Sequence, residues 1–131
     1  MLSFNQALIA LVAIALTFSS TPTPAKPMQP CTPNIEPGIT VTVADAQTKT
    51  PLQARIVIQE GKFQETLRVQ GATAAGQTIY GGAFERPGKY TVTASTPGYR
   101  STVLKNVQVP KAECHVATQQ LTIELKRTAS Q

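Results

Sequence analysis

The 131-residue chain contains no tryptophan, one histidine and two cysteines, and only 5% of its residues are aromatic. A metal cluster or a catalytic site built from several histidines needs ligands that such a chain does not have. Acidic residues are also few, with seven Asp and Glu against twelve Lys and Arg, which gives a formal net charge of +5. The composition fits one small folded domain and excludes a coiled coil, a disordered chain and a multi-span membrane protein.

Residues 1–25 are predicted to be a secretory signal peptide. An uncharged apolar run occupies residues 7–18 and is followed by small and polar residues that a signal peptidase accepts. Twelve residues of helix rise only about 18 Å, which is too short for a hydrocarbon core of roughly 30 Å. We therefore expect a periplasmic or secreted protein with no stable membrane span after cleavage, and an uncleaved N-terminal anchor is the alternative. Lipidation of Cys31 is not expected, because Pro27-Met28-Gln29-Pro30 stands where a lipobox would be.

Residues 26–37 are predicted to be a proline-rich linker. Six of the ten prolines lie between Pro22 and Pro37, a density that blocks both helix and sheet. The folded domain is therefore expected to span residues 38–127, and residues 128–131 form a tail.

The domain shows the two-residue period of β-strands and no sustained helical period. Ile39, Val41 and Val43 alternate with threonines, as in a strand with one buried face. Two apolar segments, 56–58 and 63–69, flank Gly61 and predict a hairpin. Further strands are expected around residues 79–84, 90–94, 103–109 and 116–125. Short strands recurring at this spacing favour an antiparallel β-sandwich.

Four segments of this pattern resemble the carboxypeptidase regulatory-like domain family. They are residues 43–46, 48–52, 84–92 and 97–99, which include the sequence FERPGKYTV and a Pro-Gly-Tyr turn. The resemblance implies a single seven-stranded, transthyretin-like or Ig-like Greek-key sandwich. The chain departs from the family at Lys49, where glycine is common. Either the turn changes type there or Lys49 takes a left-handed conformation at a cost of about 1 kcal/mol.

The Pro87-Gly88 pair predicts a tight turn before a core strand. Proline presets φ and glycine permits a sharp turn, so Tyr90 should enter the strand with its ring in the core. Its hydroxyl should then lie near an end of the sandwich, and Val92 should also face inward. This motif is structural, because it supplies neither a nucleophile nor a base.

The two cysteines, Cys31 and Cys114, are predicted to form a disulfide. An exported chain with one cysteine before its first strand and another near its last commonly pairs them. Cys114 and His115 are adjacent on a predicted strand, so their side chains point to opposite faces and do not form a catalytic dyad. We expect His115 at the surface with local hydrogen bonds, and no metal site, because it has no partner ligands.

No catalytic residue and no cofactor are predicted. The segment Tyr99-Arg100-Ser101-Thr102 is partly similar to the Tyr-Arg-Gly-Ser signature of the transthyretin-like hydroxyisourate hydrolases. That signature closes the chain in those enzymes, whereas 29 residues follow it here. Those enzymes also use more than one histidine.

We expect an exported, non-catalytic module with a structural or a protein- or glycan-binding role in the cell envelope or medium. Nucleic acid is not an expected partner, because the basic residues are scattered and not interleaved with aromatic ones. The alternative is a transthyretin-like hydrolase or a small-ligand carrier, which would gather its polar side chains in one pocket. The residues of a possible binding surface are Glu85, Arg86, Tyr99, Arg100 and His115.

Overall fold

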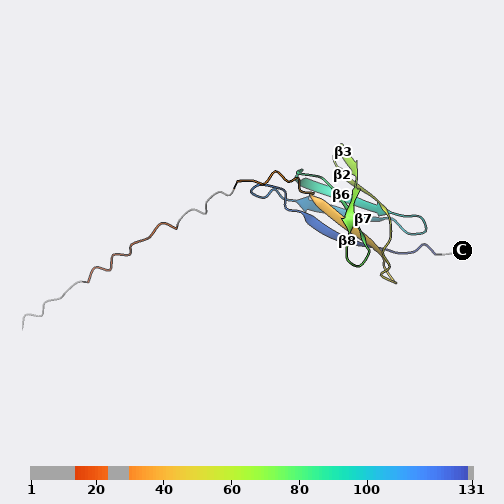
Figure 1. Ribbon diagram of the computed structural model, residues 1–131, viewed down its shortest axis with the longest axis horizontal. Coiled ribbons are helices and arrows are strands. Elements are labelled where there is room, and N and C mark those ends of the chain that lie inside the picture. The colour runs from red at the N-terminus through yellow and green to blue at the C-terminus, as the bar shows by residue number, and fades with distance from the viewer. Residues whose placement is uncertain (1–13, 24–29, 130–131) are drawn as a thin grey trace, which may run out of the picture.

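The computed structural model describes residues 14–23 and 30–129 (Figure 1). Most of the predicted signal peptide, part of the predicted linker and the last two residues lie outside these ranges. None of the described residues belongs to a helix long and apolar enough to cross a membrane.

The described chain folds into eight β-strands arranged in two four-stranded sheets, which confirms the all-β sandwich. One sheet has the order β4-β5-β1-β8 and the other has the order β3-β2-β6-β7. The strands are β1 (Ile39–Asp45), β2 (Arg55–Glu60), β3 (Phe63–Thr66), β4 (Arg68–Ala72), β5 (Thr78–Gly82), β6 (Gly88–Ser95), β7 (Thr102–Val109) and β8 (Gln119–Leu125).

The eighth strand arises because the chain changes sheet at Leu67. β3 pairs with β2 as the predicted hairpin, in which Gly61 has a φ of 55°. Leu67 then donates its N–H to the carbonyl of Ile56, and from Arg68 onward the chain pairs with β5 in the other sheet. The change of sheet also explains Val69, which is 64% exposed on the edge strand β4 and does not continue the apolar side of the hairpin.

The sandwich is not fully antiparallel, because β1 and β8 run parallel. All seven residues of β1 pair with β8, from Ile39 opposite Gln119 to Asp45 opposite Leu125. A short hairpin forces antiparallel pairing, whereas these two strands are separated by the rest of the domain and are free of that constraint. The prediction of an antiparallel sandwich is therefore wrong for this one pair.

The core lies between the two sheets and follows the predicted alternation. Tyr90 and Val92 are 1% and 0% exposed, and Pro87-Gly88 precedes them as expected. The Tyr90 hydroxyl donates to the carbonyl of Arg86 at 2.7 Å, at the end of the sandwich where β6 begins. Lys49 has a φ of 62°, which confirms the left-handed alternative for that turn.

Candidate functional site

The five predicted surface residues divide between the two ends of the sandwich. Glu85 and His115 lie where β1 begins, whereas Tyr99 and Arg100 lie where β1 and β8 end. Seven residues of strand separate these ends by about 20 Å. The predicted residues therefore form two separate groups and not one site. We call the first the disulfide end and the second the arginine end.

The disulfide end is where residues 30–37, the leading segment, join the domain. Cys31 and Cys114 are bonded, with their Cα atoms 5.2 Å apart and a sequence separation of 83 residues, which confirms the predicted pairing. The hydroxyl of Thr118 donates to the carbonyl of Pro37 at 2.6 Å. The leading segment is thus attached to the residues on both sides of His115.

His115 connects the leading segment to Glu85. Its Nε2 lies 3.0 Å from Oγ1 of Thr32, and its Nδ1 lies 2.6 Å from Oε1 of Glu85. The same carboxylate accepts the N–H of Glu36 at 2.8 Å and that of Val116 at 3.3 Å. The pKa of Glu85 is lowered, chiefly by the N–H of Glu36 and then by His115. Glu85 is therefore held as a carboxylate that ties three segments together.

Thr32, His115 and Glu85 form a hydroxyl–imidazole–carboxylate series. Such a series can transfer a proton from the hydroxyl to the imidazole while the carboxylate orients the ring. The prediction of local hydrogen bonds for His115 is wrong, because its partners Thr32 and Glu85 lie 83 and 30 residues away in sequence and no local pattern joins them. The described residues contain no group of three or more His, Cys, Asp or Glu side chains placed to hold a metal ion.

Arg86 is occupied by contacts within the domain. Its Nη1 donates to Oε1 of Glu60 at 2.8 Å and to the hydroxyl of Tyr90 at 2.9 Å, and its guanidinium lies 3.8 Å from the centre of the Phe63 ring. A Cβ at Gly88 would overlap the carboxylate of Glu60, so a side chain there would displace that carboxylate from its present position. Arg86 thus covers the end of the core and holds Glu60 and Tyr90 together.

The arginine end is organised around the buried carboxylate of Asp45, whose residue is 1% exposed. Its Oδ1 accepts the N–H groups of Gln47 and Thr48, and its Oδ2 accepts the Tyr99 hydroxyl at 2.7 Å and Nε of Arg127 at 2.8 Å. The N–H of Thr48 is the largest of the causes that hold the pKa of Asp45 well below its ordinary value. An aspartate that ends a strand and precedes a turn commonly accepts such N–H groups, so sequence reasoning had a signal for part of this cluster.

Arg100 lies beside this cluster but does not join it. Tyr99 forms an antiparallel bridge with Arg127, and the N–H of Arg100 donates to the carbonyl of Lys126 at 2.8 Å. Arg100 and Lys126 are therefore opposite each other on the two chain segments, and both are exposed. Residues directly opposite share a face, so two cations stand together on the side away from Asp45.

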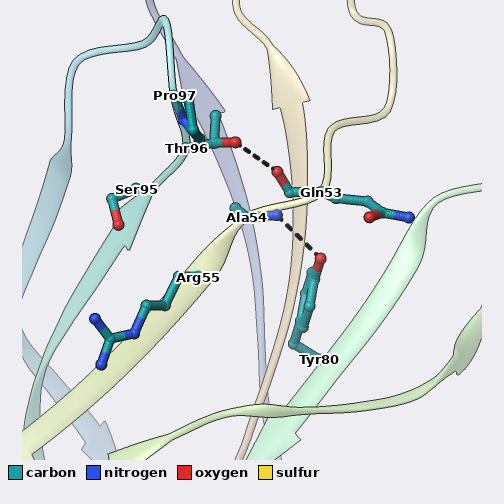
Figure 2. A pocket seen from close by; sticks show the side chains of 7 residues that line it. All are labelled: Gln53, Ala54, Arg55, Tyr80, Ser95, Thr96 and Pro97. Atoms are coloured by element: carbon teal, nitrogen blue, oxygen red, sulfur yellow. Dashed lines mark hydrogen bonds between the residues drawn. The ribbon is translucent and has the colours of Figure 1, made fainter.

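A hollow of about 590 Å³ adjoins the arginine end, and Figure 2 shows the residues that line it. The hydroxyl of Tyr80 accepts the N–H of Ala54 at 3.0 Å, and the hydroxyl of Thr96 donates to the carbonyl of Gln53 at 2.8 Å. Arg55 is directly opposite Ser95 where β2 pairs with β6. The lining residues are Gln53, Ala54, Arg55, Tyr80, Ser95, Thr96 and Pro97.

A scan against protein families and a search of curated proteins found no match to this chain. The interpretation of both ends therefore depends on their geometry.

Proposed function

We propose that the chain is an exported, non-catalytic β-sandwich module that binds a protein or glycan of the cell envelope or medium, with its leading segment fixed to the domain. The observation that carries this proposal is the attachment at the disulfide end. A disulfide is typical of oxidising, exported compartments. This one joins the leading segment to the body of the domain across 83 residues.

Three further contacts reinforce the attachment. Thr32 contacts His115, the N–H of Glu36 donates to Glu85, and the carbonyl of Pro37 accepts the Thr118 hydroxyl. Tension on the leading segment would pass through Cys31 into Cys114 before it reached β1. Because β1 lies inside its sheet between β5 and β8, its removal would open the core. The attachment thus keeps the leading segment part of the folded domain and protects β1.

The finer assignments belong to the same proposal. They are a signal peptide at residues 1–25, a periplasmic or secreted location, and a transthyretin-like Greek-key domain of the carboxypeptidase regulatory-like family. The two-sheet architecture and the Pro-Gly-Lys-Tyr sequence at residues 87–90 support the family assignment. The short apolar run followed by small residues supports export.

The experiment is to express the full chain in a bacterium, isolate the exported fraction and measure the intact mass and the thiol content. We expect a mature N-terminus between Ser20 and Lys26 and no free thiol. Immobilised oxidised protein should then retain a specific envelope protein or glycan. A chain that keeps Met1 and stays with the membrane would favour the anchored alternative. Two free thiols per folded chain would overturn the proposal.

A second candidate function, hydrolysis, is favoured by the Thr32, His115 and Glu85 series. Its test is labelling by a fluorophosphonate probe, which reacts with activated hydroxyls. Thr32→Val is compared with Thr118→Val, which removes another hydroxyl that holds the leading segment but does not contact His115 in the described structure. For a structural contact we expect no labelling of wild type and faster proteolysis in both variants. Labelling of wild type that is lost only in Thr32→Val would establish the hydrolase instead.

A further inference from the structure

The charges of the described residues are unevenly distributed between the two ends of the sandwich. The arginine end carries five cations and two carboxylates, whereas the disulfide end carries five cations and five carboxylates. Both carboxylates of the arginine end are already paired, Asp45 with Arg127 and Glu124 with Lys49. The five cations are Lys49, Arg55, Arg100, Lys126 and Arg127.

Arg55, Arg100 and Lys126 have no ion pair among the described residues. Like charges directly opposite on paired segments repel each other, so Arg100 and Lys126 are unfavourable neighbours without an anion. An anionic group between them would replace this repulsion by two attractions. Arginine is well suited to the role, because its planar fork matches a carboxylate or sulfate with two parallel hydrogen bonds.

The hollow is lined by Arg55 and supplies uncharged polar groups at the same end of the sandwich as Arg100 and Lys126. The loop of residues 96–101 contributes Thr96 and Pro97 to its lining and carries Arg100 four residues after Thr96. Arg55 is directly opposite Ser95 where β2 pairs with β6, and its side chain points away from Tyr80 (Figure 2). The volume of about 590 Å³ lies in the range of small-molecule sites. Amide, hydroxyl and guanidinium groups together match the hydroxyls and carboxylates of an acidic sugar.

We propose that the arginine end binds an acidic polysaccharide, with Arg100 and Lys126 on its anionic groups and the hollow at Arg55 on one sugar unit. This inference rests on the proposed binding function and names its partner class. A membrane surface would engage the cations but would leave the polar hollow unused, so we favour the glycan. Binding should weaken steeply with salt, because the cations are exposed and are screened within about 10 Å at 0.1 M ionic strength.

The test uses the full chain, oxidised, with polygalacturonate as the probe at an ionic strength of about 0.05 M. The variant Arg100→Gln/Lys126→Gln is compared with Lys62→Gln/Lys89→Gln, which removes the same charge from exposed positions at the disulfide end. We expect the first variant to bind about tenfold more weakly or worse, and the second to bind within about twofold of wild type. Arg55→Gln should also weaken binding, although it leaves both Arg100 and Lys126 in place. Neutral dextran should not bind.

Three outcomes would overturn the inference: no binding of polygalacturonate by wild type, equal weakening in both double variants, or binding to vesicles containing phosphatidylglycerol without binding to the polysaccharide. Equal weakening would mean that net charge alone attracts the polymer. None of these outcomes would overturn the proposed function if the exported, disulfide-bonded protein still retained a specific partner. Free thiols or a retained signal segment would instead count against the proposed function alone.

Discussion

Removal of the disulfide between Cys31 and Cys114 is expected to destabilise the domain strongly. The bond closes a loop with a sequence separation of 83 residues. In the chain-entropy model, closing such a loop lowers the conformational entropy of the unfolded chain, which stabilises the folded state by about 4.5 kcal/mol at 25 °C. That is a large fraction of the total stability of a small domain, which is typically about 5–15 kcal/mol.

The assay compares oxidised wild type with the variant Cys31→Ser/Cys114→Ser by urea and thermal denaturation. We expect a loss of about 4.5 kcal/mol in the free energy of unfolding, and a fall of about 20 °C in Tm for a domain of this size. The m-value should rise, because an unfolded chain without the crosslink exposes more surface. Limited proteolysis should cut the variant before Pro37, since the leading segment loses its covalent attachment.

The control is wild type that has been reduced and alkylated, which should behave like the double variant. A loss below about 1 kcal/mol in both proteins would refute the reasoning, because the loop would then contribute far less than its length requires. An unchanged proteolysis pattern before Pro37 would show that Thr32, Glu36 and Thr118 hold the leading segment without the bond.

Two further changes test the core and the arginine end. Tyr90→Ala should lower the free energy of unfolding by about 3–5 kcal/mol in chemical denaturation. Tyr90→Phe should lower it by about 1 kcal/mol, because this variant loses only the hydroxyl. A loss below about 1 kcal/mol for Tyr90→Ala would contradict the core assignment. The pKa of Asp45 is held well below its ordinary value of 3.8, chiefly by the N–H of Thr48 and then by Arg127. The ionised carboxylate therefore stabilises the fold above about pH 4, and this stabilisation is lost as the pH falls further. Asp45→Asn should therefore lower Tm at pH 7 and flatten the fall of Tm below about pH 4; an equally steep acid transition would place the responsible carboxylate elsewhere.

Features that depend on neighbouring residues could be predicted from the sequence. The alternation of Ile39, Val41 and Val43 predicted a half-buried strand, and the structure confirms it, because side chains on successive residues face opposite sides of a sheet. The Pro87-Gly88 turn likewise predicted the inward position of Tyr90. The disulfide could also be inferred, because two cysteines in a chain with a predicted export signal commonly pair.

Pairings between distant segments were decided only by the tertiary structure. The parallel register of β1 with β8 follows from how the two sheets close, and neither strand carries a local signal of its partner. The same holds for Thr32 beside His115 and for Arg100 opposite Lys126.

The predicted surface residues separated for the same reason. Glu85 and Arg100 are only 15 residues apart in sequence, but β6 runs between them and carries the chain from one end of the sandwich to the other. The sequence by itself thus determined which residues face the core and where the chain turns. The tertiary structure decided which polar side chains meet, because that depends on the end of the sandwich at which each loop emerges.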